Sequence, residues 1–291
     1  MKKKQKVALS VGMLVVIIAM LIVILVVLPE PSEDEITPEP VDAFEPDTVE
    51  QARPEPAIPE PEPVAPPAKV VFIVIDDVGN SLAHLDYYLD LPVDITFALL
   101  PGRPYTEESA RRIGRAGFDM ILHQPMEPEG GQDPGSGAIL TSMSSAEIQA
   151  TLQRNLAGLP RLAGINNHMG SKATSDAATM KAVMAYLDST KMFFLDSVTT
   201  DRSLAGEAAR AQNVLYAKRN ALFLDNDGDR AHVEKAFDSG IAVAATTGES
   251  VMIGHLKTAA LADVIREQYK GLIEDGFAFR GMAAYFDDRS R

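Results

Sequence analysis

The sequence predicts an α/β fold in residues 69–291, preceded by one membrane-spanning helix and a disordered linker. Three observations lead to this expectation. A long uncharged apolar run lies close to the N-terminus, a proline- and glutamate-rich stretch follows it, and beyond residue 68 short apolar runs alternate with segments of helical periodicity. Alternation of strands and helices is typical of a mainly parallel sheet or barrel.

The apolar run, Val7–Leu28, contains no charge and no proline in 22 residues, and four lysines lie among the first six residues. As a helix it would be about 33 Å long, enough to cross a hydrocarbon core of about 30 Å. A cleaved signal peptide would have a shorter apolar region and a small-residue cleavage site, and the lysines argue against a buried core helix. We expect a cytoplasmic basic tail at residues 1–6, an uncleaved anchor at residues 7–28, and the C-terminal body across the membrane.

Residues 29–68 have the composition of a disordered linker. They hold 12 of the 19 prolines and 12 acidic residues, against the single basic residue Arg53. Such a segment buries too little apolar surface to fold, so we expect an extended tether. The tail contributes +4 and the linker −11 to the formal charge of −14, which leaves −7 for residues 69–291. A mildly acidic body indicates no nucleic-acid partner, and the absence of cysteine excludes disulfides and thiolate metal ligands.

The body, about 220 residues, has the length of one α/β domain. Seven apolar runs are interpreted as buried strands: Val70–Ile75, Ile95–Leu100, Met120–Leu122, Met192–Leu195, Ala221–Leu224, Ile241–Ala245 and Val251–Ile253. Four segments between them have helical spacing: Tyr105–Ala116, Ala146–Leu156, Asp176–Leu187 and Arg230–Asp238. Ser144 with Glu147 forms a capping box, and Ser175 is a candidate cap for the next helix. Gly117 and Gly240 are placed to end helices immediately before new strands.

Carboxylate or imidazole side chains follow six successive apolar runs: Asp76 and Asp77, His123, His168 (after the short run Gly164–Ile165), Asp196, Asp225 and His255. Active sites of parallel α/β folds form at these carboxyl ends of strands. A single Asp there is often only a helix cap, and a single His is often a hydrogen-bonded core residue. His84 and His232 lie within helical patterns and are interpreted as ordinary. The convergence of three histidines on an Asp pair predicts a metal site, because paired carboxylates need a shared cation or proton.

The motifs around these residues occur in a specific order: Ile75-Asp76-Asp77, His123-Gln-Pro-Met-Glu127, Asn166-Asn-His168-Met-Gly-Ser171, Phe194-Leu-Asp196-Ser197, Phe223-Leu-Asp225 and Ile253-Gly-His255. In this order they resemble the divergent polysaccharide deacetylases, a distant branch of the carbohydrate deacetylases. The resemblance extends over Lys69–Phe286. It implies a distorted (β/α) barrel of about seven strands and a bound divalent metal, with zinc favoured.

The resemblance also implies roles for individual residues. Asp77 corresponds to the metal-binding member of the Asp pair and Asp76 to the catalytic base. His123 corresponds to the first histidine of a His-x-x-x-His motif whose second histidine is replaced here by Glu127. His168 is expected to supply the missing imidazole, and Glu127 is the alternative third ligand.

A second group of residues is expected to assist. His255 stands where the family keeps a late catalytic histidine, followed here by Leu256 and Lys257 instead of the proline often found in relatives. Asp225 is a candidate for orienting His255. Candidates for fixing the metal-binding imidazoles are Asn166, Asn167 and Asp196.

These residues together predict a metal-dependent hydrolase that removes N- or O-acyl groups from an envelope polysaccharide or a peptidoglycan-like glycan. Asp76 would deprotonate the attacking water and His255 would protonate the leaving group. The alternative is a non-catalytic, membrane-tethered glycan-binding or envelope-assembly protein with a structural metal, favoured by the replaced histidine and by the absence of the family's Arg-x-Pro-Tyr substrate motif. With the anchor, the expected location is the bacterial inner (cytoplasmic) membrane, single-pass, with the body on the periplasmic or extracytoplasmic side.

Overall fold

The computed structural model describes residues 69–287, except residues 161, 227 and 228. The expected anchor at residues 7–28 and linker at residues 29–68 lie outside the described residues. Among the helices that the structure describes, none is both long and apolar enough to cross a membrane.

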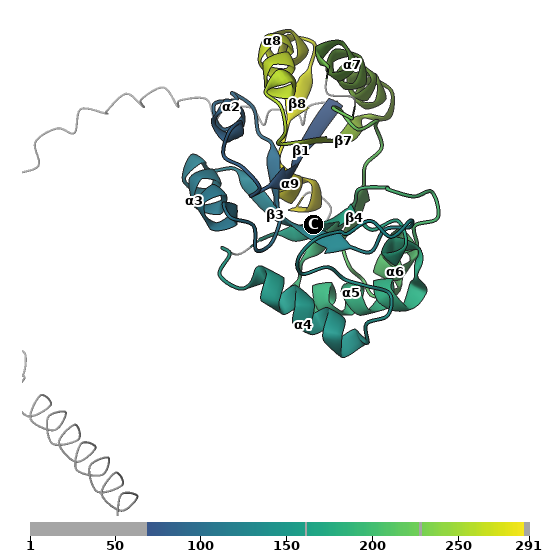
Figure 1. The fold of residues 1–291 in the computed structure, drawn as a ribbon. Coiled ribbons are helices and arrows are strands. Elements are labelled where there is room, and N and C mark those ends of the chain that lie inside the picture. Colours follow the sequence, from purple (N-terminus) through teal and green to yellow (C-terminus); the bar gives the residue numbers. More distant parts are fainter. Residues whose placement is uncertain (1–68, 161, 227–228, 288–291) are drawn as a thin grey trace, which may run out of the picture. The chain divides into compact units, whose positions relative to one another are not determined.

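The described chain forms a parallel sheet that curls into a nearly closed barrel (Figure 1). Its strands are β1 (Lys69–Val78), β2 (Thr96–Leu99), β3 (Asp119–Met126), β4 (Gly164–Met169), β5 (Phe193–Asp196), β6 (Tyr216–Lys218), β7 (Glu249–His255) and β8 (Phe277–Phe279). The hydrogen-bonded order is β6-β5-β4-β3-β2-β1-β7, and β8 pairs with the start of β1. The predicted parallel α/β architecture and the barrel of about seven strands are thereby confirmed.

The barrel closes through the chain that follows β6. The N–H of Asn220 donates to the carbonyl of Val251 (3.2 Å), and the N–H of Leu224 donates to the carbonyl of Ile253 (2.9 Å). Phe223 forms an isolated parallel bridge with Ile253. This segment therefore joins the edge at β6 to β7 by a few bonds rather than by a full strand.

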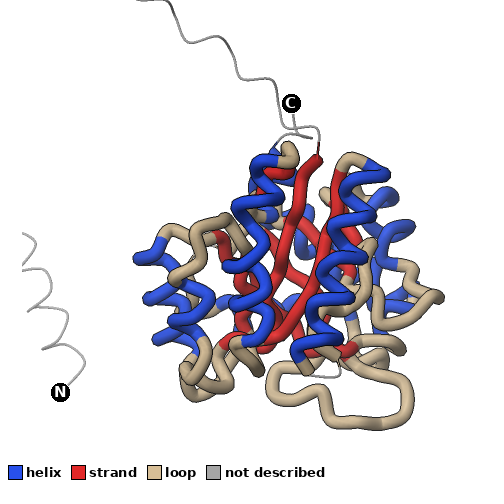
Figure 2. Tube along the Cα trace, turned by 90° about the horizontal axis from the view of Figure 1, so that it is seen from above, coloured by secondary structure: helices blue, strands red, loops and turns tan. Residues whose placement is uncertain are grey.

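Helices cover the outside of the ring of strands: α2 (Leu85–Leu89), α3 (Thr106–Ala116), α4 (Ser145–Leu156), α5 (Ala177–Thr190), α6 (Ala205–Ala211), α7 (Arg230–Thr247) and α8 (Ala260–Glu274). The perpendicular view shows them running beside the strands, with loops gathered at the strand ends (Figure 2). The last helix, α9 (Met282–Asp287), lies in the middle of the ring (Figure 1). The ring of strands thus has one apolar layer outside it and another inside it.

The inner layer is a separate apolar cluster made by side chains from the strands and from α9: Phe72, Val74, Ala98, Ile121, Phe193, Leu195, Ala217, Val251, Ile253, Met282 and Phe286. The ring of Phe286 stacks on that of Phe193 at 4.0 Å between centroids. Side chains of a strand alternate between its two faces. The next inward positions along four strands are polar: Asp76, His123, Asn166 and His255. The fold therefore places a polar layer directly above an apolar one.

Three expectations about the segments that form α5 and α7 are wrong. Ile241–Ala245 is part of α7 rather than a strand. Gly240 does not end a helix but lies inside α7. A Cβ at this position would lie 2.0 Å from the sulfur of Met252, so the glycine permits close packing of α7 on β7. Ser175 does not cap α5; Asp176 does, by accepting from the N–H of Thr179.

Other local expectations hold. Ser144 and Glu147 form the capping box of α4, and Gly117 ends α3 in the left-handed conformation. The expected strand at Ala221–Leu224 is wrong: this run contributes only the bridge at Phe223. The strand beside β5 is Tyr216–Lys218 instead, at the end of the short apolar run Val214–Ala217.

The inner apolar layer yields a stability prediction. Replacing Phe286 by Ala should lower the free energy of unfolding by about 3–5 kcal/mol, because it removes a buried aromatic ring from the base of the barrel. Urea denaturation of the full-length protein measures this change. Tyr87→Ala is the control, since that side chain is 50% exposed and its loss should change the free energy by no more than about 0.5 kcal/mol. Equal effects of the two substitutions would contradict the packing role of α9.

Candidate metal centre and active site

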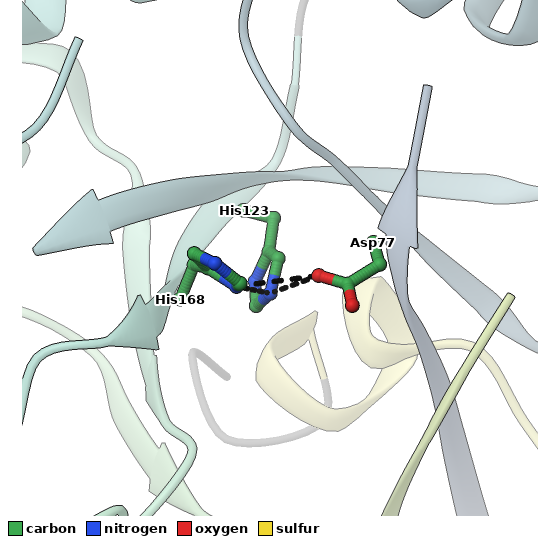
Figure 3. A group of neighbouring side chains, drawn as sticks. All are labelled: Asp77, His123 and His168. Atoms are coloured by element: carbon green, nitrogen blue, oxygen red, sulfur yellow. Dashed lines mark hydrogen bonds and ion pairs between the residues drawn. The ribbon is translucent and has the colours of Figure 1, made fainter. Parts of the chain in front are cut away.

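Three of the predicted residues meet at one end of the barrel (Figure 3). Asp77 comes from the end of β1, His123 from β3 and His168 from β4. Asp77 Oδ1 lies 3.4 Å from His123 Nε2 and 3.2 Å from His168 Nδ1, and the two nitrogens are 3.0 Å apart. These three atoms form a compact triangle of possible metal ligands.

The sides of the triangle, 3.0–3.4 Å, come within about 0.3 Å of the separations expected between the ligands of a divalent metal. Zinc bonds of about 2.0–2.2 Å in tetrahedral geometry separate ligand atoms by about 3.3–3.6 Å. Asp77 Oδ1 is a buried oxygen with no hydrogen-bond partner, which is costly unless a cation satisfies it. The side chains of Asp77 and His168 are 31% and 22% exposed, so one side of the cluster faces solvent. The residues fit a cation site with an accessible open side.

Asn166 determines which nitrogen of His123 carries the proton. Its side-chain nitrogen donates to Asp76 Oδ1 at 2.8 Å and to the hydroxyl of Ser197 at 3.3 Å. Its oxygen therefore faces His123 Nδ1, at 2.8 Å, and can only accept. Nδ1 of the neutral imidazole then holds the proton and Nε2 keeps a free lone pair toward Asp77 and His168.

The electrostatics of the cluster favour a bound cation. Burial lowers the pKa of His123, but the charges of Asp76 and Asp77 outweigh burial and raise it above its ordinary value. Burial raises the pKa of Asp77, but His123 and His168 outweigh it and hold that pKa well below its usual range. A proton and a metal ion compete for the same imidazole, so metal binding is expected to displace that proton.

Asp76 is almost completely buried beside this triangle. Its Oδ2 lies 3.6 Å from His123 Nε2, and its Oδ1 accepts from Asn166. Burial raises the pKa of Asp76, against the lowering effects of His123, His255 and the Asn166 hydrogen bond. A desolvated carboxylate with a raised pKa is suited to act as a general base.

His255 is the last residue of β7 and pairs in register with Asp76 on β1. Its Nδ1 lies 2.8 Å from Asp225 Oδ1, and its backbone N–H donates to Asp225 Oδ2 at 2.9 Å. The ring of Phe223 stacks on the imidazole at 5.6 Å, and the guanidinium of Arg219 lies 4.0 Å from the centre of the Phe223 ring. Asp225 thus fixes the orientation of His255, as expected, and leaves Nε2 free to exchange a proton.

Glu127, the alternative third ligand, is occupied elsewhere. Its Oε2 accepts from the N–H and the hydroxyl of Thr141, both at 2.7 Å, and its Oε1 accepts from Lys172 at 2.6 Å. These contacts, that of Lys172 first, lower the pKa of Glu127 to about 2. The geometry therefore favours His168 over Glu127 as the third ligand.

Two of the assisting residues do not reach the imidazoles. Asp196 accepts from the hydroxyls of Ser203 (2.6 Å) and Tyr216 (3.2 Å) and from the N–H of Val198 (2.8 Å). Asn167 accepts from the N–H of Ser197 at 2.9 Å. Both shape the turn after β5 rather than the site, and Asn166 alone of the three proposed residues contacts an imidazole.

The backbone is strained at three strand ends around the site. Asp77, Met169 and Val198 have φ of 62°, 53° and 52°, and for the β-branched Val198 this is a marked outlier. The guanidinium of Arg219 donates to the carbonyls of Ser197 (2.9 Å) and Val198 (3.0 Å) and so fixes this turn. Strain that persists under such constraint is typical of functional sites. Arg219 was not predicted, and no sequence motif marks it.

Comparison with known proteins agrees with these motifs. A model of the divergent polysaccharide deacetylase family matches residues 73–286. The uncharacterized protein YibQ of Escherichia coli K12 is 36% identical over 183 residues, which cover 63% of this chain and 57% of YibQ. An uncharacterized protein of Haemophilus influenzae Rd is 33% identical over 203 residues, which cover 70% of this chain and 72% of that protein.

Solved structures share the fold. The uncharacterized protein ATU2773 of Agrobacterium tumefaciens C58 has a TM-score of 0.72 at 21% identity, over 77% of this chain and 92% of that one. A putative cellobiose-phosphate cleavage protein (EF3048) of Enterococcus faecalis V583 has a TM-score of 0.51 at 11% identity, over 75% and 98% of the two chains. At these identities the likeness concerns the fold alone.

The ligand triangle leads to a prediction about metal content. Elemental analysis of the zinc-supplied protein should find about one metal per chain, and His123→Gln or His168→Gln should abolish binding because each removes one of three ligands. Glu127→Gln should retain the metal. His84→Gln, at the start of α2, is the matched control. Retention of metal by His168→Gln together with its loss from Glu127→Gln would reverse the ligand assignment.

Proposed function

The chain belongs to the divergent polysaccharide deacetylase family, and on this premise we propose that it is a metal-dependent hydrolase that removes acyl groups from an envelope polysaccharide. One observation supports the proposal above all. The ligand triangle lies beside a buried carboxylate, Asp76, and near an imidazole, His255, that is oriented by its own carboxylate. A metal that served only to stabilise the fold would require neither of these two residues.

Three residues of the site would bind the metal, and Asn166 orients the side chains around it. Asp77, His123 and His168 would hold the metal, and two imidazoles with one carboxylate suit zinc. When bound there, the metal would supply a Lewis acid that polarises the acyl carbonyl. Asn166 orients His123 and Asp76 at once, through hydrogen bonds of 2.8 Å to each.

Asp76 would act as the base. As water adds to the acyl carbonyl carbon, its proton passes to the Asp76 carboxylate. The fixed hydrogen bond from Asn166 to Oδ1 leaves Oδ2 as the proton acceptor. Burial strengthens this role, because a desolvated carboxylate binds a proton more readily than an exposed one.

His255 would act as the acid. The bond from the acyl carbon to the sugar nitrogen or oxygen breaks, the acyl group leaves as a carboxylic acid, and the sugar heteroatom takes its proton from Nε2 of His255. Burial lowers the pKa of His255, but the contacts with Asp225 and the charge of Asp76 outweigh burial and raise it. The imidazole is therefore held in a proton-donating form by the two carboxylates beside it.

A test of catalysis uses Asp76→Asn, which keeps an oxygen for Asn166 but removes the base. Acetate release from an acetylated glucosamine oligomer should fall by about 10²–10⁴-fold, while metal content is unchanged. Asp90→Asn, an exposed aspartate on the surface, is the control and should retain full activity. If the wild-type protein binds metal but releases no acetate, and Asp76→Asn behaves identically, the non-catalytic glycan-binding alternative replaces the hydrolase.

We further propose that residues 7–28 anchor the domain in the bacterial inner membrane and that residues 29–68 tether it on the extracytoplasmic side. The support is the uncharged run of 22 residues behind four lysines. The full-length protein should remain in the membrane pellet after alkaline carbonate extraction, and deletion of residues 1–28 should release it into the supernatant. Complete extraction of the full-length protein would contradict an uncleaved anchor.

A further inference from the structure

Two hollows meet beside the metal centre. The smaller one is lined by the metal-ligand candidates Asp77 and His168, together with Asn80 and Pro134. The larger one, of about 430 Å³, extends along the start of α3 and the end of α4. Three residues line both of them: Pro101, Arg103 and Ser136. The two hollows therefore form one groove that leads away from the metal centre.

Two arginines line this groove without a carboxylate partner. Arg103, in the loop after β2, donates from Nε to Asn80 Oδ1 at 2.5 Å, and Arg154, in the last turn of α4, donates to the hydroxyl of Thr151 at 2.8 Å. Neither makes an ion pair within the part of the chain that the structure describes. Five other arginines do pair with carboxylates: Arg111, Arg112, Arg202, Arg230 and Arg266.

The charge of the groove contrasts with that of the body. Residues 69–291 carry a formal charge of −7, yet the larger hollow is lined by two cations and one acid, Glu107. A guanidinium presents a planar fork of donors that matches a carboxylate. Neither hollow is lined by a phenylalanine or tyrosine among the described residues, although ligand pockets are usually rich in aromatic side chains. The groove is thus built for an anionic group rather than for stacking on an uncharged ring.

The groove wall admits a ligand close to the main chain. Gly102 and Gly135 both line it, and both have positive φ, of 62° and 95°. A Cβ built on Gly102 would meet nothing within 4 Å, so open space lies beside the backbone at that point. A sugar ring could lie against this wall while its charged substituent reaches the arginines.

We propose that this groove binds a carboxylate on a sugar neighbouring the acylated one, so that the substrate class is an acidic acylated glycan. This inference rests on the proposed hydrolase function for its reaction, but the binding itself depends only on Arg103 and Arg154. The carboxylate can belong to a uronic acid or to a lactyl ether on the sugar, and the two present the same group to the guanidinium forks.

The test measures the activity of the zinc-supplied full-length protein on three oligosaccharides of equal length. One contains only N-acetylglucosamine, one alternates it with glucuronate, and one alternates it with a lactyl-ether sugar. At least one acidic oligomer should have a kcat/KM for acetate release about tenfold above that of the neutral one, and the advantage should shrink at high ionic strength. The preferred acidic oligomer identifies the source of the carboxylate.

Substitution of the two groove arginines tests whether they cause the preference for acidic oligomers. In Arg103→Gln and Arg154→Gln the ratio of acidic to neutral kcat/KM should fall at least about fivefold. Arg210→Gln is the matched control, because that arginine on α6 is exposed, makes no ion pair with the described residues and lies outside the groove. No preference for either acidic oligomer, or an equal loss on all three substrates in the two groove variants, would overturn the proposal.

A binding measurement separates this proposal from the proposed reaction. Isothermal titration of Asp76→Asn with the acidic oligomer should show binding that Arg154→Gln, combined with it, weakens at least about fivefold. If the wild-type protein releases no acetate but this arginine-dependent binding is present, the hydrolase proposal fails and the groove stands. If acetate is released and the acidic oligomer binds no better than the neutral one, the groove proposal fails and the hydrolase stands.

Discussion

Side chains along a parallel strand alternate between two faces, and in a closed barrel only one of those faces is enclosed. On this inner face the chain stacks two unlike layers. Phenylalanines, small aliphatic residues and α9 fill the lower layer, and the next inward positions carry Asp76, His123, Asn166 and His255. The dry lower layer excludes water from below, which explains why Asp76 and His123 are buried although the site opens to solvent above. The chemistry proposed for the site depends on this arrangement.

Within the polar layer, the side-chain amide of Asn166 forms hydrogen bonds with both Asp76 and His123. Asn166 has one donor group and one acceptor, and it uses the donor toward Asp76 and the acceptor toward His123. The same side chain therefore fixes which oxygen of Asp76 and which nitrogen of His123 remain free. An aspartate in its place could not donate to Asp76, and two adjacent carboxylates would repel each other. Asp225 orients His255 in a similar way, but with a carboxylate, which suits the proposed role of His255 as a proton donor.

The same alternation explains what the sequence could and could not predict. The ends of strands were recognisable from apolar runs, so the gathering of Asp77, His123 and His168 was predictable, while their roles stay predictions. Asp196 also ends a strand, but it follows the inward Leu195 and so lies on the other face of β5. Asp77 should face outward by the same rule, and its positive φ turns it back toward the histidines. Ile241–Ala245 looks like a strand in the sequence but belongs to α7, because a short apolar run has no period that separates strand from helix. The position of α9 inside the ring depends on contacts distant in sequence, which no local pattern contains.

The distribution of charge suggests that the groove, rather than the metal centre, would attract an anionic substrate. A divalent metal would balance the negative charges of Asp76 and Asp77, so the centre would offer little long-range attraction to an anionic polymer. The rest of the body is acidic and would repel such a polymer. Among the described residues Arg103 and Arg154 make no ion pair, and their positive charge lies in the groove that begins at Asp77 and His168. A glycan drawn by these two side chains would be held with its neighbouring acyl group directed at the metal centre, which couples the choice of substrate to the position of the reacting bond.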